Sequence, residues 1–395
     1  MRVLFLTHRL PYAPNRGDRV RAFHLLREMR HWADVDLVSL VHDPEEASHV
    51  RDLDSLASSV RVARVWKPVN AVRGAFGLLS SRPLTHTLLH SGALRRSVQA
   101  AVRGSRPDVI LAFCTGIAPI TLEPPLDGLP LVVDMVDVDS AKWEALAEAS
   151  SGLRAWVYRR EARTLAHFER DIADHATATI LTTDVERQLL RRVAPEARIE
   201  VIENGVDAEA LRPSAKPSAD EVVVFCGVMN YTPNVHGVVW MVREVWPMVR
   251  QAHPHARLQI VGSNPTSTVE SLADPQTGVE VTGRVPDVRP YLWGAALSVA
   301  PLHTARGVQN KVLEAAAAGL PVVVTPAVLK GLPPEVHAAC ASAETAVEFA
   351  NLVVRWLAEA PDARRARAAS AKIQSLSWER RLAPLRWILE RAAGG

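Results

Sequence analysis

Short apolar runs alternate along the first half of the chain with longer stretches whose apolar positions recur at helical spacing. The runs predict strands at 3–7, 35–39, 60–65, 109–113, 131–134, 178–182 and 199–202, and the longer stretches predict helices near 19–30, 84–103, 142–173 and 184–192. Because the strands are apolar on both faces and separated by helices, they predict a parallel sheet that is covered on both sides.

The same alternation restarts after a break. Residues 207–220 have the composition of a linker. Beyond it we expect strands at 222–226, 258–261, 279–282, 297–300, 322–325 and 336–340, and helices near 235–250, 288–295, 308–318, 343–359, 362–373 and 378–391. The chain of 395 residues is too long for one ordinary core, so the pattern predicts an α/β protein of two doubly wound domains.

Composition narrows the class of protein. The chain is 48% hydrophobic and 23% charged, which is typical of a globular protein, and no apolar run is long enough for a membrane-spanning helix. The apolar run at the N-terminus turns polar after a few residues, so we interpret it as a strand and not as a signal peptide. Cys114, Cys226 and Cys340 are widely spaced and lie in apolar strands, which favours reduced thiols and a cytoplasmic location.

Charge is distributed unevenly. Residues 55–107 contain no Asp or Glu but carry many arginines, interleaved with Trp66 and several leucines. This composition suits the anionic surface of a membrane, and equally one solvated basic face of a helix pair. Nucleic acid is a weaker alternative, because the aromatic residues are not interleaved as single-strand binding requires.

The most informative segment is 305–319, Ala-Arg-Gly-Val-Gln-Asn-Lys-Val-Leu-Glu-Ala-Ala-Ala-Ala-Gly. Gly307 permits a close backbone approach, and the helix expected to start near Val308 offers unpaired N–H groups to a phosphate. Lys311 and Glu314 lie three positions apart and share one helical face. The cation suits a diphosphate and the carboxylate suits the hydroxyls of a ribose or sugar, while the alternative is a surface ion pair on an amphipathic helix.

Other loops follow strands and are expected at the same edges of the two sheets. Gly17 lies at a helix start with Arg16 or Arg19 as charge partners, but its loop lacks the glycine spacing of a dinucleotide site, which argues against NAD. Further candidates are Asn204 in an Asn-Gly hinge, Gly227 in the first loop of the second domain, and Arg284 with Val285, whose backbone could contact a base. Asn234 is interpreted as a helix N-cap, and Asp287 as another.

Three carboxylates end the strand predicted at 131–134. Asp137-Val138-Asp139 has the spacing of a metal motif, but no other oxygen ligands lie clearly nearby, so we expect no metal there. We interpret Asp137 or Asp139 as an acceptor-positioning or basic group. Most charges on the helix behind them, including Arg160, Glu161 and Glu169, are expected on a solvated face.

These motifs together resemble a known family. The run Gly-Arg-Val-Pro-Asp-Val-Arg-Pro-Tyr from residue 283, the segment 306–325, the Glu-Asn-Gly-Val-Asp sequence from residue 203 and the Ser377-Trp378 helix are similar to glycosyltransferase family four. Residues 6–21 and Asp137-Val-Asp-Ser-Ala-Lys-Trp resemble a narrower group, the sugar transferases associated with bacterial exopolysaccharide and exosortase (PEP-CTERM) loci.

The resemblance implies a GT-B-type fold with two Rossmann-like domains facing a cleft. The first would comprise 1–207 on the acceptor side, with 376–395 crossing back onto it, and the second 208–375 on the donor side. It implies a nucleoside-diphosphate sugar as donor, a glycan or lipid-linked acceptor, retention of anomeric configuration, and no cofactor or obligatory metal. The implied donor-binding residues are Gly17, Asn204, Gly227, Arg284, Val285, Gly307, Lys311 and Glu314, and the implied catalytic residues are Lys311, Arg306, Asp137 and Asp139.

The chain also departs from the family pattern. The family usually has a glutamate eight positions before Glu314, where this chain has Arg306, and it often has a basic pair where this chain has Val228 and Pro233 or Asn234. Despite these departures, the resemblance implies a retaining hexosyltransferase of exopolysaccharide synthesis. We expect the enzyme in the cytoplasm or peripheral at the inner face of the membrane. The alternatives are a sugar-nucleotide epimerase or hydrolase on the same fold, and a non-catalytic subunit that binds nucleotide sugars.

Overall fold

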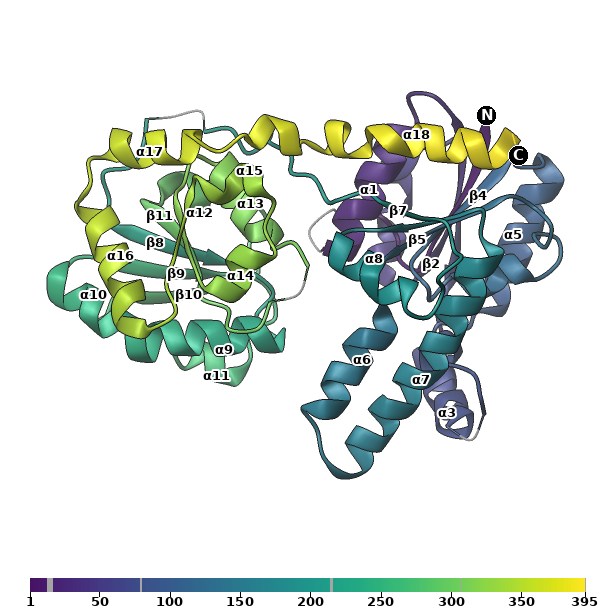
Figure 1. Ribbon diagram of the computed structural model, residues 1–395, viewed down its shortest axis with the longest axis horizontal. Coiled ribbons are helices and arrows are strands. Elements are labelled where there is room, and N and C mark those ends of the chain that lie inside the picture. The colour runs from purple at the N-terminus through teal and green to yellow at the C-terminus, as the bar shows by residue number, and fades with distance from the viewer. Residues whose placement is uncertain (13–16, 79, 214–215, 306, 395) are drawn as a thin grey trace. The chain divides into compact units, whose positions relative to one another are not determined.

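The computed structural model describes residues 1–12, 17–78, 80–213, 216–305 and 307–394 (Figure 1). The chain divides into two compact units. Unit 1 comprises Met1–Glu203 together with the residues from Arg381 onward, and unit 2 comprises Asn204–Arg380. The stretch of linker composition, 207–220, lies within unit 2.

Within the described residues, unit 1 is built on a parallel sheet of seven strands in the order β3-β2-β1-β4-β5-β6-β7. Its strands are β1 (Arg2–Thr7), β2 (Asp34–Val41), β3 (Ser59–Arg64), β4 (Val109–Phe113), β5 (Leu131–Val136), β6 (Ala178–Leu181) and β7 (Ile199–Val201). Its helices are α1 (Gly17–Met29), α2 (Pro44–Ser48), α3 (Lys67–Gly77), α4 (Leu84–Leu88), α5 (Gly92–Gly104), α6 (Asp139–Glu148), α7 (Gly152–His175) and α8 (Asp184–Arg191).

The register of this sheet explains why its strands are apolar on both faces. Phe5 of β1 pairs with Leu37 of β2 on one side and with Leu111 of β4 on the other. Side chains alternate along a strand, so Leu4 and Leu6 face the opposite side, where they join the core that includes α5, α7 and α8. Every residue of β4 is buried. The prediction of a parallel sheet covered on both sides is confirmed.

Unit 2, in the part that the structure describes, has a parallel sheet of six strands in the order β10-β9-β8-β11-β12-β13. The strands are β8 (Val222–Cys226), β9 (Arg257–Val261), β10 (Val279–Gly283), β11 (Leu297–Ala300), β12 (Val322–Val324) and β13 (Cys340–Ser342). The helices are α9 (Thr232–Trp240), α10 (Trp246–Ala252), α11 (Ser267–Glu270), α12 (Arg289–Gly294), α13 (Asn310–Ala317), α14 (Pro326–Lys330), α15 (Pro334–His337), α16 (Ala346–Ala358) and α17 (Pro361–Ala369).

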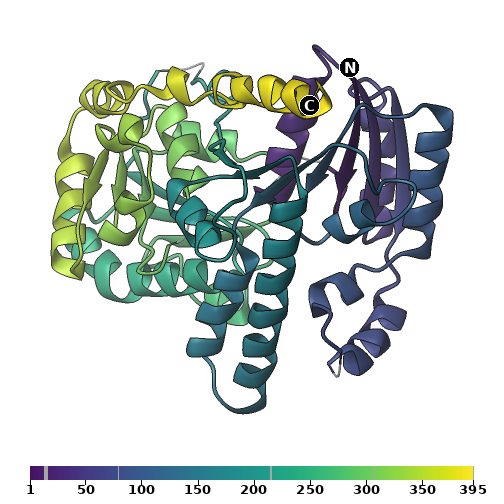
Figure 2. The same ribbon diagram turned by 45° about the vertical axis from the view of Figure 1, so that its right-hand side comes forward.

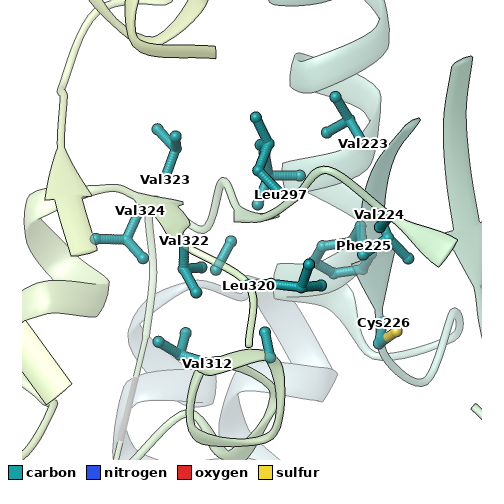
Figure 3. Packing of buried hydrophobic residues seen from close by; sticks show 14 of the residues in the cluster. Val223, Val224, Phe225, Cys226, Leu297, Val312, Leu320, Val322, Val323 and Val324 are labelled. Atoms are coloured by element: carbon teal, nitrogen blue, oxygen red, sulfur yellow. The ribbon is translucent and has the colours of Figure 1, made fainter. Parts of the chain in front are cut away.

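The core of unit 2 fixes the helix that carries the most informative segment. Figure 3 shows Val312 of α13 close to Leu320 and Val322, below the strand side chains at the centre of the sheet. Val312 and Val322 are fully buried, as is Phe225 of β8 apart from a trace of its surface. Full burial of each such side chain contributes about 1.5–3 kcal/mol. The packing therefore holds α13 against the sheet with its polar residues at the sheet edge.

Several predicted elements differ from the structure. Residues 336–340 were expected as a strand, but α15 occupies Pro334–His337 and the strand begins only at Cys340. Pro334 explains the difference, because proline favours the first turn of a helix. The single helix expected at 142–173 is a hairpin of α6 and α7, broken before Gly152, whose φ of 60° suits glycine. Figure 2 shows the two helices side by side, leading away from the sheet.

The last helix, α18 (Trp378–Gly394), passes from unit 2 into unit 1. At its start Val206 N donates to Leu376 O at 2.8 Å, and a Cβ on Gly205 would lie 2.5 Å from Trp378 Cα. Farther along, Arg381 pairs with Glu203 at 2.8 Å within unit 1. The predicted crossing of the last helix is confirmed. No helix among the described residues is long and apolar enough to span a membrane.

The expectation of a solvated charged face on α7 is wrong for its centre. Arg160 and Glu161 are both buried. Arg160 Nε and Nη2 donate to the carbonyls of Gly77, Leu78, Ser80 and Arg82. Glu161 accepts from Leu84 N at 2.7 Å and from Thr85 N at 2.8 Å. These two neighbours therefore fix the described residues of the connection between α3 and α4.

We expect Arg160→Met to loosen this connection, because the freed carbonyls lose their donors while the methionine retains the packing. Amide hydrogen exchange at 77–88 should accelerate by about tenfold or more, since local opening becomes less costly. Arg163→Met is the matched control, because Arg163 is exposed on the same helix. Unchanged exchange at 77–88 in Arg160→Met would contradict the role of Arg160.

Candidate functional site

The strand order of unit 2 places a switch point between β8 and β11. The chain moves from β8 to β9 on one side and later returns to β11 on the other side. Loops that follow β8 and β11 therefore diverge at the carboxyl ends of these strands, which is where open α/β sheets bind ligands. The loop after β11 leads into α13, so Gly307, Lys311 and Glu314 all lie on this connection.

Lys311 is held at the end of β8. Its Nζ donates to Asn234 Oδ1 at 2.6 Å and lies 4.9 Å from the centroid of the Phe225 ring. A cation over an aromatic face is favourable by roughly 0.5–2 kcal/mol. The side chain is partly buried, so it is anchored by protein groups while part of its surface stays accessible.

Asn234 has a different position from the one expected. Helix α9 begins at Thr232 with Tyr231 as N-cap, so Asn234 lies in its first turn and does not cap it. The side chain is buried, and its Nδ2 donates to Val228 O at 2.9 Å. Its Oδ1 thereby faces Lys311.

Lys311 and Glu314 titrate close to neutrality. Burial lowers the pKa of Lys311 to about 8, against the opposing effect of the Glu314 charge. Burial raises the pKa of Glu314 to about 7, against the opposing effect of Lys311. Cys226 lies near both, and burial together with the Glu314 charge raises the pKa of its thiol to about 12. Lys311 and Glu314 each favour the charged form of the other, and the Cys226 thiol near them stays neutral.

Glycines bring the backbone of the loops together at this edge. A Cβ on Gly262 would lie 1.6 Å from the carbonyl oxygen of Gly227, and Gly262 has a φ of 154°. A Cβ on Gly227 would lie 2.8 Å from Asn234 Nδ2. Gly307 has a φ of 60°, and a Cβ on Gly331 would lie 2.8 Å from its carbonyl oxygen. The sequence identified Gly227 and Gly307, but nothing in their loops pointed to Gly262 or Gly331.

The other candidates of unit 2 lie on separate loops. Arg284 and Val285 follow Gly283, whose φ of 67° ends β10 and whose carbonyl accepts from Gly262 N at 3.2 Å. Arg284 is exposed and Val285 packs against the core. Asn204 is the first residue of unit 2 and precedes Gly205. Arg306 lies outside the described residues.

In unit 1 the carboxylates in β5 and just after it are fixed by polar partners. Asp134, which is fully buried, accepts from Arg21 Nε of α1 at 2.9 Å. Burial raises the pKa of Asp134 and the Arg21 charge opposes this. Asp137 accepts from Thr182 Oγ1 at 3.1 Å, and Asp139 accepts from Thr115 Oγ1 at 2.7 Å.

The backbone at this edge is strained. Cys114 after β4 has a φ of 70°, and Val136 at the end of β5 has a φ of 69°. Side chains with a Cβ rarely adopt this region, and such strain is concentrated at functional sites. The Asp137 residue is exposed, yet desolvation of its carboxyl raises the pKa, with a smaller contribution from the Asp139 charge.

Sequence reasoning missed the carboxylate that orders this loop. Glu169 of α7 is buried, not solvated as expected, and accepts from Ser140 N at 3.0 Å and from Ser140 Oγ. Burial raises the pKa of Glu169 to about 7. Its partner lies on the neighbouring helix α6, and no local pattern in the sequence of α7 reveals that contact.

Gly17 is the first residue of α1, while Arg16 lies outside the described residues. Arg19, the other expected charge partner, pairs with the buried Glu46. In the ranges that the structure describes, no three His, Cys, Asp or Glu side chains are grouped as a metal ion would need.

Comparison with known proteins identifies the family. Residues 220–359 match the model described as "Glycosyl transferases group 1", and residues 16–205 match the "Glycosyl transferase 4-like domain". The two models cover most of the chain, which belongs to this family of glycosyltransferases and is an enzyme of that class. Among curated proteins, none matches the sequence.

Solved structures agree on the fold. The structure of Anabaena Alr3699/HepE in complex with UDP has a TM-score of 0.66 at 14% identity, covering 99% of this chain and 100% of the other. WaaG, a glycosyltransferase of lipopolysaccharide biosynthesis, has a TM-score of 0.66 at 16% identity and full coverage of both chains. Trehalose 6-phosphate synthase from Burkholderia multivorans has 0.64 at 11%, covering 100% and 99%. The chain therefore has the GT-B-type fold of two Rossmann-like domains that was predicted.

We expect Gly262→Ala to disrupt the edge of unit 2, because its Cβ has no room beside Gly227 and the backbone conformation disfavours alanine. The free energy of unfolding should fall by about 2–4 kcal/mol, measured by denaturant titration. Gly294→Ala is the control, since a Cβ there meets nothing within 4 Å. Equal stability of both variants would show that the two loops can separate without cost.

Proposed function

We propose that the protein is a retaining glycosyltransferase that moves a hexose from a nucleoside-diphosphate sugar to an exopolysaccharide or lipid-linked glycan precursor. The observation that carries this proposal is the Lys311–Glu314 pair at the switch point of unit 2, a cation and a carboxylate that are both poised near neutral pH. The cation suits the diphosphate and the carboxylate suits the hydroxyls of a ribose.

The structural neighbours support uracil as the base of the donor. Alr3699/HepE has been solved in complex with UDP, with UDP and glucose, and with UDP-glucose. A Staphylococcus aureus TarM variant has been solved with UDP and with fondaparinux and a GlcNAc-glycerol. These complexes favour a UDP-sugar donor and a glycan acceptor for the present chain.

The donor-binding roles follow the loops of unit 2. We assign Lys311 and the backbone near Gly307 to the diphosphate, with Arg306 as a further partner. Glu314 would accept two hydroxyls, and Arg284 with Val285 would flank the base. Asn204 and Gly227 would border the site.

Catalysis would depend on the charge that develops on the departing diphosphate. Basic groups that bind this charge more strongly in the transition state lower the barrier. The acceptor hydroxyl attacks the anomeric carbon on the face from which the diphosphate departs, and a departing phosphate oxygen takes its proton. Asp137 and Asp139 would orient the acceptor. No resident metal or cofactor is required, because cationic side chains neutralise the diphosphate.

The acceptor side favours a lipid surface. In residues 55–107, Trp66 is 61% exposed, Val69 49% and Leu88 44%. Arg64 lies over the Trp66 ring at 5.1 Å. Exposed apolar side chains among cations suit an anionic bilayer. We place the enzyme in the cytoplasm, peripheral at the inner face of the cell membrane, in the exopolysaccharide pathway of an exosortase-type locus.

We expect Lys311→Ala to lower kcat/KM for the donor by about 10²–10³, because a charge partner of the leaving group is lost. The measurement is sugar transfer with the nucleotide sugar that a thermal-shift panel selects. Lys330→Ala is the control, since Lys330 is exposed at the end of α14. Equal activity of Lys311→Ala and the control would refute the assignment. Products formed from donor alone would instead indicate an epimerase or hydrolase.

We expect a bell-shaped pH dependence of kcat/KM for the donor. Activity should rise as Glu314 loses its proton near pH 7 and fall as Lys311 loses its proton near pH 8, the two limbs belonging to the coupled pair. Lys311→Arg should move only the alkaline limb upward, because a guanidinium stays charged. A profile that is flat between about pH 6 and 9 would contradict the roles of both groups.

A further inference from the structure

Asn234 makes two side-chain hydrogen bonds that the sequence did not predict. Its Oδ1 accepts from Lys311 Nζ at 2.6 Å, and its Nδ2 donates to Val228 O at 2.9 Å. The second bond fixes which end of the amide faces Lys311, because only the Nδ2 end can donate to a carbonyl. The missing side chain of Gly227 leaves the space in which the amide lies.

Among the described residues, the groups whose charge acts on Lys311 are Glu314 and Cys226. On its own helix stands Glu314, and on β8 stand Cys226, whose thiol is protonated, and the Phe225 ring. Lysine has four flexible side-chain bonds, so an ammonium without an anchor would sample many positions. A neutral oxygen anchors the ammonium without adding a negative charge, whereas a carboxylate at the same distance would add a second anion beside Glu314 and lower the net positive charge of the site.

We propose that Asn234 is a positioning residue: its uncharged oxygen holds the Lys311 ammonium at the carboxyl end of β8, so that the full positive charge meets the donor diphosphate. The diphosphate part of this inference rests on the proposed function, while the anchoring of Lys311 does not. Asn234 acts through Lys311 and is not itself a catalytic residue.

The first experiment measures Lys311 without any donor. The chain has six lysines, at 67, 142, 216, 311, 330 and 372. Competitive acetylation followed by mass spectrometry gives the pKa of each lysine in one titration. We expect Asn234→Asp to raise the pKa of Lys311 by about one or more, through the added anion, and Asn234→Leu to lower it, through loss of the acceptor. The other five lysines should not change.

The control is Asn351→Asp, an exposed position on α16 of the same unit. If one Asn234 variant fails to fold, the other decides, because each shifts the pKa in its own direction. A pKa of Lys311 that equals the wild-type value in a folded Asn234 variant would overturn the proposal, since a merely structural asparagine would change stability and leave Lys311 unaffected.

The second experiment measures binding of UDP at pH 7 by calorimetry. Both Asn234 variants should weaken UDP binding by about tenfold. Asn234→Leu should do so because the ammonium of Lys311 loses its anchor, and Asn234→Asp because the added anion opposes the charge of the ammonium. Asn351→Asp should bind UDP like the wild type. Wild-type UDP affinity in both variants would overturn the link to the diphosphate. Shifted Lys311 pKa values in a protein that binds no nucleotide would refute the proposed function and leave the anchoring of Lys311 established.

Discussion

The candidate site of unit 2 depends on one cation and one anion, Lys311 and Glu314. Both are largely surrounded by protein at the carboxyl end of the parallel sheet. Desolvation favours the neutral form of both Lys311 and Glu314, and the charge of each opposes this effect on the other. Each charge therefore depends on the other.

Backbone geometry makes this pair available. The loops after β8, β9 and β10 approach one another through Gly227, Gly262 and Gly283, where side chains would collide or the backbone is left-handed. Phe225 and Asn234 then enclose the ammonium from the β8 side. In unit 1 the corresponding edge is formed differently, with strain at Cys114 and Val136 and with carboxylates held by hydroxyls and by Arg21. The two sheets share one topology, but the chemistry at their edges is not duplicated.

Local periodicity predicted most strands and the helix of Lys311, because burial on both faces leaves a continuous apolar run and α13 has a clear apolar stripe. The sequence failed where a residue depends on partners distant along the chain. Arg160 was expected in solvent because it is charged. The sequence does not show that carbonyl groups within 77–82 accept hydrogen bonds from its guanidinium. Asn234 was interpreted as a cap for the same reason. Pro334 was a local signal for a helix, but the apolar residues beside it were given more weight.

The chain leaves unit 1 after Glu203 and returns to it at Arg381, so unit 2 is an insertion within unit 1. The two segments that connect the units lie against each other: Val206 N donates to Leu376 O, and Gly205 packs closely against the backbone of Trp378. During synthesis on the ribosome, residues 381–394 emerge only after the whole of unit 2. Unit 1 is therefore started first but receives its last helical segment at the very end. A nascent chain must therefore keep the surface destined for Leu385 and Leu389, both fully buried in the finished protein, uncovered while an entire second domain is synthesised.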